Sequence, residues 1–313
     1  MTVLVTGADG FLGSILMSRN PDFLGVDRFR KNKNVFLCDL GDEQSLRKIL
    51  IDNEVTEIVH LAGVQFSSYI RRGQRSNFFS QNVLMAQSIS NVVNSIGIKK
   101  IVYVSTDMVY GDRVNSPVTE DSVPNPIGEY GASKLAAEKI FSHTSNEYEV
   151  VILRPRLILG KGRVGTIQKL ANLINSPFPV VLIGNGKNKY QFVAAEDVCS
   201  AIELSLGFKT KGIFNIGSDD PPKLDDLFKE TLTNLNRKKK VIKLPFKAAI
   251  LIFNILDRLG VSPLTPEQFK IAGLDYILST EKIKSQLGWS PTKNDQTMLF
   301  ESLHDLNVWK QDL

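Results

Sequence analysis

The feature that most constrains the fold is a glycine-rich segment directly after the first apolar run of the chain. Residues 3–5 form that run, and Gly7, Gly10 and Gly13 follow it before a helical pattern over residues 11–19. Glycines at this spacing allow a tight turn, a close approach of backbone to a phosphate group, and close packing of helix on strand. Strand, loop and helix in this order predict the first unit of a parallel sheet that binds a dinucleotide.

Strand-like and helix-like segments continue to alternate through the first half of the chain. Strands are expected at residues 23–27, 35–38, 57–61, 101–105 and 150–153, and helices at residues 43–52, 77–97 and 131–142. Apolar strands alternating with helices predict an α/β fold with a doubly wound parallel sheet, covered by helices on both faces.

Beyond about residue 155 glycine and proline become more frequent, which indicates a second, less regular lobe. We expect a dinucleotide-binding domain over residues 1–155 and a smaller substrate lobe over residues 156–313, intertwined with the first. Residues 192–193 and 214–216 are candidates either to rejoin the main sheet or to form a small separate one. An amphipathic helix is expected after Pro245 and through Leu259.

Charge and composition argue against several classes of partner. The 38 Lys and Arg against 33 Asp and Glu give a net charge of +5. The one dense basic run, residues 237–240, is typical of a solvated turn, so no nucleic-acid partner is expected. The longest apolar stretch starts at Ala248 and is far shorter than the roughly 20 residues that span a bilayer. With no basic, apolar leader at the N-terminus, we expect a cytoplasmic protein with no membrane partner.

Cysteine and histidine are scarce. Cys38 and Cys199 lie far apart in apolar surroundings, and the three histidines have no metal-ligand spacing. We therefore expect buried thiols and no metal site.

The end of the second expected strand carries the acidic group that such a cofactor site needs. Asp27 follows Gly13 by 14 residues, and a carboxylate there can accept both ribose hydroxyls of NAD and repel a 2′-phosphate. The basic residues Arg28, Arg30 and Lys31 follow, so NAD is favoured and NADP remains the alternative. Asp39 and Leu40 end the third strand, where they could meet the adenine edge.

A tyrosine and a lysine lie one helical turn apart at the start of the helix expected at residues 131–142. Tyr130 and Lys134 have the spacing that puts two side chains on one helix face. An ammonium beside a phenol lowers its pKa from about 10, which suits the phenol for acid–base work near neutral pH. Thr106, at the end of the preceding strand, could hydrogen-bond the same substrate oxygen, and Asn82 is a supporting polar group.

These residues resemble the extended short-chain dehydrogenase/reductases, also called the NAD-dependent epimerase/dehydratase family, which have a Rossmann fold. The motifs that carry the resemblance are TGADGFLG (6–13), Asp27, HLAG (60–63), Asn82, VSTDMVYG (104–111), YGASK (130–134) and LRP (153–155). Weaker similarities at IGNGK (183–187), FNIGS (214–218) and LGWSP (287–291) extend it over nearly the whole chain.

The resemblance implies an enzyme in which Thr106, Tyr130 and Lys134 are catalytic and Asn82 supports them. It implies hydride transfer at C4 of a nucleotide-linked hexose, by a 4-epimerase or a 4-keto reductase. Together with the strand-end positions above, it assigns the cofactor to Gly7, Asp9, Gly10, Phe11, Leu12, Gly13, Asp27, Arg28, Asp39, Leu40, Leu61, Ala62, Gly63, Ser105, Tyr130, Lys134 and Pro155. It also suggests a homodimer formed through the helices at residues 77–97 and 131–142.

Departures from the family pattern bear on the reaction and the substrate. The segment Thr106-Asp107-Met108 resembles the Thr-Asp-Glu segment of the 4,6-dehydratases, with Met108 in place of the glutamate. A thioether cannot be the acid–base group that eliminates water. The asparagine that often follows Arg-Pro is replaced by Arg156. We expect the substrate to be bound by Thr106, Asp107, Met108, Arg156, Arg163 and Tyr190.

Two other functions remain open at this point. A dehydrogenase of another secondary alcohol, similar to the 3β-hydroxysteroid dehydrogenases, would suit the missing diphosphate signatures. A non-catalytic dinucleotide-binding protein would have no need of the Tyr130 proton donor.

Overall fold

A seven-stranded parallel sheet forms the centre of the molecule. The computed structural model describes residues 1–29, 32–64, 76–112, 115–143 and 148–308. The strands are β1 (Val3–Thr6), β2 (Leu24–Asp27), β3 (Val35–Leu37), β4 (Glu57–His60), β5 (Lys100–Val104), β6 (Glu149–Pro155) and β10 (Gly212–Ile216). Their order is β10-β6-β5-β4-β1-β2-β3, so the chain winds outward from β1 in both directions. This confirms the expected doubly wound parallel sheet.

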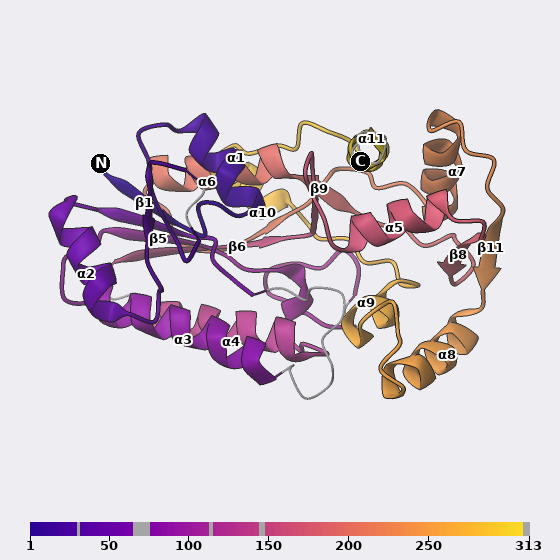
Figure 1. The fold of residues 1–313 in the computed structure, drawn as a ribbon, viewed down its shortest axis with the longest axis horizontal. Coiled ribbons are helices and arrows are strands. Elements are labelled where there is room, and N and C mark those ends of the chain that lie inside the picture. The colour runs from indigo at the N-terminus through magenta and orange to yellow at the C-terminus, as the bar shows by residue number, and fades with distance from the viewer. Residues whose placement is uncertain (30–31, 65–75, 113–114, 144–147, 309–313) are drawn as a thin grey trace.

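Helices cover both faces of this sheet (Figure 1). On one face lie α2 (Glu43–Asp52), α3 (Ser76–Val93) and α4 (Glu129–His143); on the other lie α1 (Phe11–Arg19), α6 (Ala195–Gly207) and α10 (Glu281–Leu287). Successive strand residues point to opposite faces. In β5, for example, Ile101 packs under α3 and α4, and Val102 packs under α6. Apolar residues at consecutive strand positions are therefore buried from both sides.

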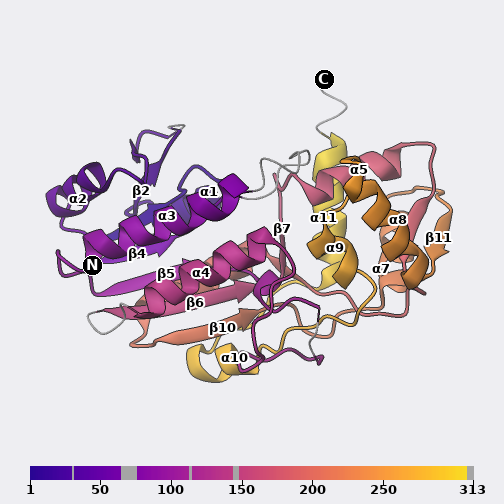
Figure 2. The ribbon, with the colours of Figure 1, turned by 90° about the horizontal axis from the view of Figure 1, so that it is seen from below.

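The second half of the chain builds a lobe at one end of the sheet (Figure 2). Two small parallel sheets lie in it: β7 (Leu157–Leu159) with β9 (Phe192–Ala194), and β8 (Val180–Ile183) with β11 (Val241–Leu244). Its helices are α5 (Thr166–Asn175), α7 (Leu224–Asn234), α8 (Phe246–Arg258), α9 (Pro266–Ile271) and α11 (Asp295–Val308).

The structure shortens one expected helix and decides between the alternatives for the two late strands. The helix expected at residues 77–97 ends at Val93, because Ser95 and Ile96 bond to the third residue before them and Gly97 has a φ of +71°. Of the two late strand candidates, β10 rejoins the main sheet beside β6, and β9 pairs with β7 outside it. No helix in the described part of the chain is long and apolar enough to cross a membrane.

Candidate active site

The glycine-rich loop connects β1 to α1 in a turn that leaves little room for side chains. A Cβ on Gly13 would lie 2.2 Å from the Gly7 carbonyl oxygen, and one on Gly7 would lie 2.8 Å from the amide nitrogen of Ala62. Gly10 is the N-cap of α1 and has no side chain to accept from the first amides of the helix. Those amides face the carboxyl ends of the strands, where such a helix start binds phosphate groups.

Asp27 ends β2 beside this loop. Its carboxylate accepts from the amide of Asp9 at 3.1 Å and from the amide of Phe29 at 3.3 Å. Asp9 is itself bonded to the side chain of Asn32. Arg28 is exposed, with its guanidinium 5.5 Å from the Phe29 ring, while Arg30 and Lys31 lie outside the described residues.

The end of β4 is held against β1 by a buried hydroxyl. Thr6 Oγ1 lies 2.7 Å from Nδ1 of His60 and accepts from the amide of Ala62 at 3.3 Å. Leu61, Ala62 and Gly63 thereby leave the sheet next to the glycine loop. Asp39 and Leu40, at the end of β3, form a neighbouring turn in which the Asp39 carboxylate accepts from the Gly41 amide at 2.9 Å. Pro155 ends β6, in register with Ile216 of β10.

Lys134 of α4 lies at the carboxyl ends of β4 and β5. Its side chain is buried, Nζ donates to the carbonyl of Val104 at 2.8 Å, and it lies 4.4 Å from the centre of the Tyr103 ring. A Cβ on Gly63 would lie 3.7 Å from this Nζ. Burial lowers the pKa of Lys134 to about 7, against the opposing effect of Glu138.

Asn82 of α3 connects the end of β4 to α4. Its Oδ1 accepts from the amide of Val64 at 2.8 Å, and its Nδ2 donates to the hydroxyl of Ser133 at 2.9 Å. The same Oδ1 would lie 3.7 Å from a Cβ on Gly63. Asn82 therefore positions backbone beside Lys134, which fits the supporting role expected for it.

Thr106 lies directly after β5 and begins a short 3₁₀ helix. Its hydroxyl donates to Oδ1 of Asp107 at 3.2 Å and accepts from the amide of Met108 at 3.3 Å. Tyr130, in the first turn of α4, is half-buried. Burial lowers the pKa of Arg163, and the nearby Tyr130 phenol opposes this effect in part. The Arg163 guanidinium also lies 5.0 Å from the centre of the Phe11 ring, at the start of α1. Arg163 thus lies near both the start of α1 and Tyr130.

Arg156, expected to bind substrate, lies in a buried ion pair. Its side chain is 1% exposed, and Nη1 forms an ion pair with Asp107 Oδ2 at 2.6 Å. The guanidinium is stacked between the rings of Tyr190 and Tyr276, at 4.7 and 4.6 Å. Asp107 and Arg156 are buried and Tyr190 is half-buried, so three residues expected to bind substrate contact one another beside Thr106. Nε and Nη2 of Arg156 have no hydrogen-bond partner among the described residues.

Ser105, expected to bind the cofactor, directly follows β5. Its buried hydroxyl donates to Glu138, which is also paired with Arg154. The Arg154 guanidinium lies 4.7 Å from the Tyr110 ring.

Glu267 of α9 is a site residue that the sequence did not reveal. Its buried carboxylate accepts from the amide of Gly131 at 3.3 Å and from that of Tyr130, at the start of α4. Burial raises its pKa to about 7. No local pattern could have found it, because 136 residues separate it from Gly131.

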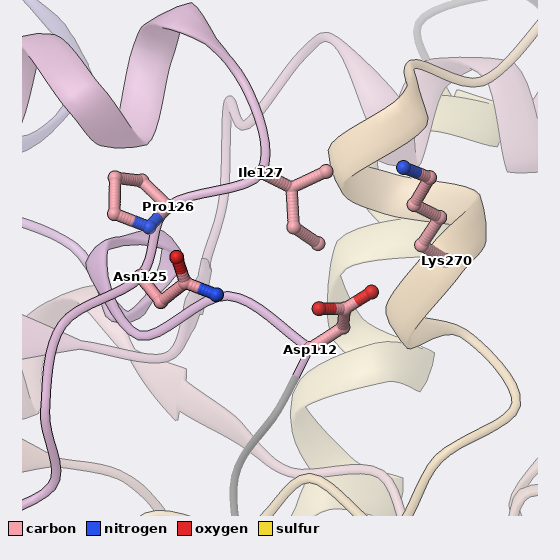
Figure 3. Close-up of a pocket in the computed structure, with 5 residues that line it drawn as sticks. All are labelled: Asp112, Asn125, Pro126, Ile127 and Lys270. Atoms are coloured by element: carbon pink, nitrogen blue, oxygen red, sulfur yellow. The ribbon is translucent and has the colours of Figure 1, made fainter.

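A pocket lies next to this contact, between the loop before α4 and the helix α9 (Figure 3). It is lined by Asp112, Asn125, Pro126, Ile127 and Lys270. None of these five is among the residues expected to bind cofactor or substrate. The candidate active site is therefore defined by the strand ends and α4, and not by this pocket.

Known proteins share both the sequence pattern and the fold. A model of the NAD dependent epimerase/dehydratase family matches residues 3–217. An uncharacterized protein of Sinorhizobium fredii is 28% identical, over 96% of this chain and 77% of that protein. A dTDP-glucose 4,6-dehydratase of Streptomyces niveus is 26% identical, over 93% of this chain and 88% of that enzyme.

A solved structure extends this similarity to the whole architecture. It is a UDP-glucuronic acid 4-epimerase from Bacillus cereus, in complex with UDP-glucuronic acid and NAD. It has a TM-score of 0.78 and 20% sequence identity, with 99% of this chain and 100% of that chain covered. Both lobes described above are therefore part of one known fold.

Proposed function

The chain belongs to the NAD dependent epimerase/dehydratase family of enzymes, and we propose that it acts at C4 of a nucleotide-linked hexose, as a 4-epimerase or a 4-keto reductase. The observation that carries the proposal is the position of Lys134 Nζ. It lies beside Gly63 at the end of β4, on the helix that also carries Tyr130. The glycine loop and the turn of α4 that carries Tyr130 and Lys134 thus lie at one edge of the sheet, which supports a dinucleotide site with an acid–base pair.

The residues at this edge fit NAD. The tight turn at Gly7 and Gly13 brings backbone where phosphates can approach, and Asp27 can accept the ribose hydroxyls. A side chain at Gly63 would fill space in front of Lys134. When bound, NAD supplies the carbon that takes up or returns hydride. The Bacillus cereus neighbour contains NAD, which supports the same cofactor here.

The proton chemistry is assigned to the protein's own groups. Tyr130 would take the hydroxyl proton of the substrate as C4 is oxidised and return it on reduction. Lys134 would hold the ribose and favour the ionised phenol when it is charged. Thr106 has a hydroxyl that is already in a hydrogen-bonding turn and would orient the substrate oxygen.

The features of the Thr106 loop favour redox chemistry alone over loss of water. Met108 follows Asp107, and its thioether can neither give nor take a proton. For this reason we do not propose a 4,6-dehydratase, although the Streptomyces niveus relative is one. With Arg156 buried, Arg163 is the basic residue of our set that we assign to a substrate diphosphate.

The second candidate function is oxidation of another secondary alcohol. The observation in its favour is the ion pair between Arg156 and Asp107, which engages one residue expected to contact a diphosphate.

A homodimer through α3 and α4 remains part of the proposal, supported by the exposed side chains of Phe79 and Leu84 on α3.

The decisive experiment is to denature the dialysed protein, identify any released cofactor by mass spectrometry, and assay hexose turnover. A 4-epimerase is expected to retain NAD and to interconvert nucleotide-hexose epimers. A 4-keto reductase is expected to be empty and to consume NAD(P)H with a nucleotide-linked 4-keto hexose. If neither reaction occurs and no nucleoside diphosphate raises the melting temperature, the second candidate takes its place.

A further inference from the structure

Helix α8 presents large apolar side chains outward. Leu251, Ile252, Ile255 and Leu259, the last just past its end, are 63%, 44%, 48% and 69% exposed. Other apolar residues of the helix, including Phe246, Ala249 and Phe253, pack inward against Phe269 of α9. The helix is thus apolar on two faces, and intramolecular packing in the described part of the chain accounts for only one.

The neighbouring sheet of β8 and β11 also has exposed apolar side chains. Ile183 and Leu244 of these strands pack in the cluster beneath α8 and α9. Side chains two residues apart along a strand point to the same face. Val181 and Ile242, which are paired in register, therefore lie on that face as well, and they are 44% and 39% exposed.

Positive charge is concentrated in the same segment. Residues 237–261 contain seven Lys and Arg and one Asp, a net charge of +6, whereas the whole chain carries +5. The rest of the chain therefore has a net charge of −1. Lys239 and Lys243 bond to Ser176 and Asp225. The other five basic side chains are exposed: Arg237, Lys238, Lys240, Lys247 and Arg258.

We propose that this basic apolar surface, formed by α8, β8, β11 and the run at residues 237–240, docks on an anionic lipid bilayer. A helix that lies in the plane of the membrane buries apolar side chains among the lipids, while Lys and Arg contact the headgroups. The sequence predicts no membrane partner because its longest apolar stretch is too short to span a bilayer. In-plane docking needs no spanning segment, and it replaces that expectation.

Charge also argues against a second copy of the chain as the occupant. Two copies related by a two-fold axis would place the same +6 segment on both sides of the contact. The helices that we propose for dimerisation, α3 and α4, cover the main sheet, whereas α8 lies in the other lobe, at the end of the molecule opposite α2 (Figure 1).

The test is co-sedimentation of the full chain with vesicles. One set contains phosphatidylcholine alone, and the other contains equal parts of phosphatidylcholine and phosphatidylglycerol. The protein is expected to sediment with the anionic vesicles only. Raising the salt from about 0.1 M to about 1 M should release it, because the screening length falls from about 10 Å to about 3 Å.

Two sets of variants separate the apolar and the basic parts of the surface. The double variant Leu251→Gln/Ile255→Gln should weaken vesicle binding at least tenfold. The control is Ile51→Gln on α2, which removes an exposed apolar side chain outside the surface and should leave binding unchanged. Gln at Lys238, Lys240, Lys247 and Arg258 should weaken it similarly. Gln at Lys99, Lys139, Lys209 and Lys211 removes the same charge elsewhere and should weaken it much less.

Three results would overturn the proposal. The first is wild-type protein that stays in the supernatant with anionic vesicles. The second is binding that Leu251→Gln/Ile255→Gln leaves unchanged while its melting temperature shows that it is folded. The third is a dimer in analytical ultracentrifugation that this double variant abolishes, because α8 would then be a self-association surface.

Discussion

The Lys134 ammonium lies in surroundings that disfavour its charge. Burial lowers its pKa to about 7, and Glu138 opposes that effect only in part. Because the folded-state pKa of Lys134 lies below its unfolded value of 10.5, its contribution to the stability of the protein is fully present above pH 10.5. That contribution is lost as the pH falls through 7. His60 is buried as well, which lowers its pKa to about 3, and the nearby charge of Lys134 lowers it further.

The phenol of Tyr130 is the group for which we expect the largest single effect on activity. Tyr130→Phe removes the hydroxyl that exchanges the substrate proton, so turnover should fall at least about a hundredfold. NAD affinity should change little, because the glycine loop and Asp27 are untouched. Steady-state assays and calorimetric NAD titration measure the two effects.

Tyr148→Phe is the matched control, since Tyr148 is a buried tyrosine just before β6, at the opposite end of the strands. It should retain most of the activity. Near-wild-type turnover in Tyr130→Phe would remove Tyr130 from the mechanism.

At the scale of elements, α4 depends on the second lobe for its N-terminus. Glu267 of α9 accepts from the amides of Tyr130 and Gly131, two of the four that a helix start leaves without an intrahelical partner. The lobe that we propose to bind substrate therefore holds the turn that carries Tyr130. Gly131 also packs closely here, because a Cβ on it would lie 2.5 Å from the carbonyl oxygen of Met108.

This contact predicts a pH dependence of stability. Burial raises the pKa of Glu267 from 4.5 to about 7, so its contribution is fully present below pH 4.5 and is lost as the pH rises through 7. Glu267→Gln keeps an acceptor oxygen and cannot titrate. Between pH 5 and 8, the unfolding free energy of wild type minus that of the variant should fall, by up to about 3 kcal/mol.

Urea denaturation across this pH range measures the difference. Glu129→Gln serves as the control, because Glu129 is exposed on the same first turn of α4. If both variants follow the wild-type pH dependence, Glu267 does not titrate as its burial implies.

At the scale of the whole molecule, the second half of the chain completes the sheet that the first half begins. β10 pairs with β6 over five residues, and Phe214 and Ile216 pack in one core cluster with Val151 and Leu153. Trp289, after α10, is buried in the same cluster. The two expected domains thus share a hydrophobic core.

A fragment of residues 1–155 should therefore fail to fold by itself. Without α6, α10 and β10, one face of its sheet would be exposed to water over β5 and β6. We expect circular dichroism to show no cooperative melting transition for the fragment and one for the full chain. A fragment that melts cooperatively would show that the first 155 residues form an independent domain.

Local patterns in the sequence determined the fold class and much of the candidate site. The glycine loop, the strand-end Asp27 and the pair of Tyr130 and Lys134 each meet a requirement that acts over a few residues, so their spacing is readable. The bounds of α1 and α2 match those expected from the sequence.

Only the tertiary structure decided which distant groups meet. Arg156 pairs with Asp107 across 49 residues, and Glu267 caps α4 across 136. Such ion pairs and caps depend on how loops return and leave no period in the sequence. The apolar pattern of α8 likewise predicted a helix, but its exposed face was decided by the packing of α9, β8 and β11 on the other side.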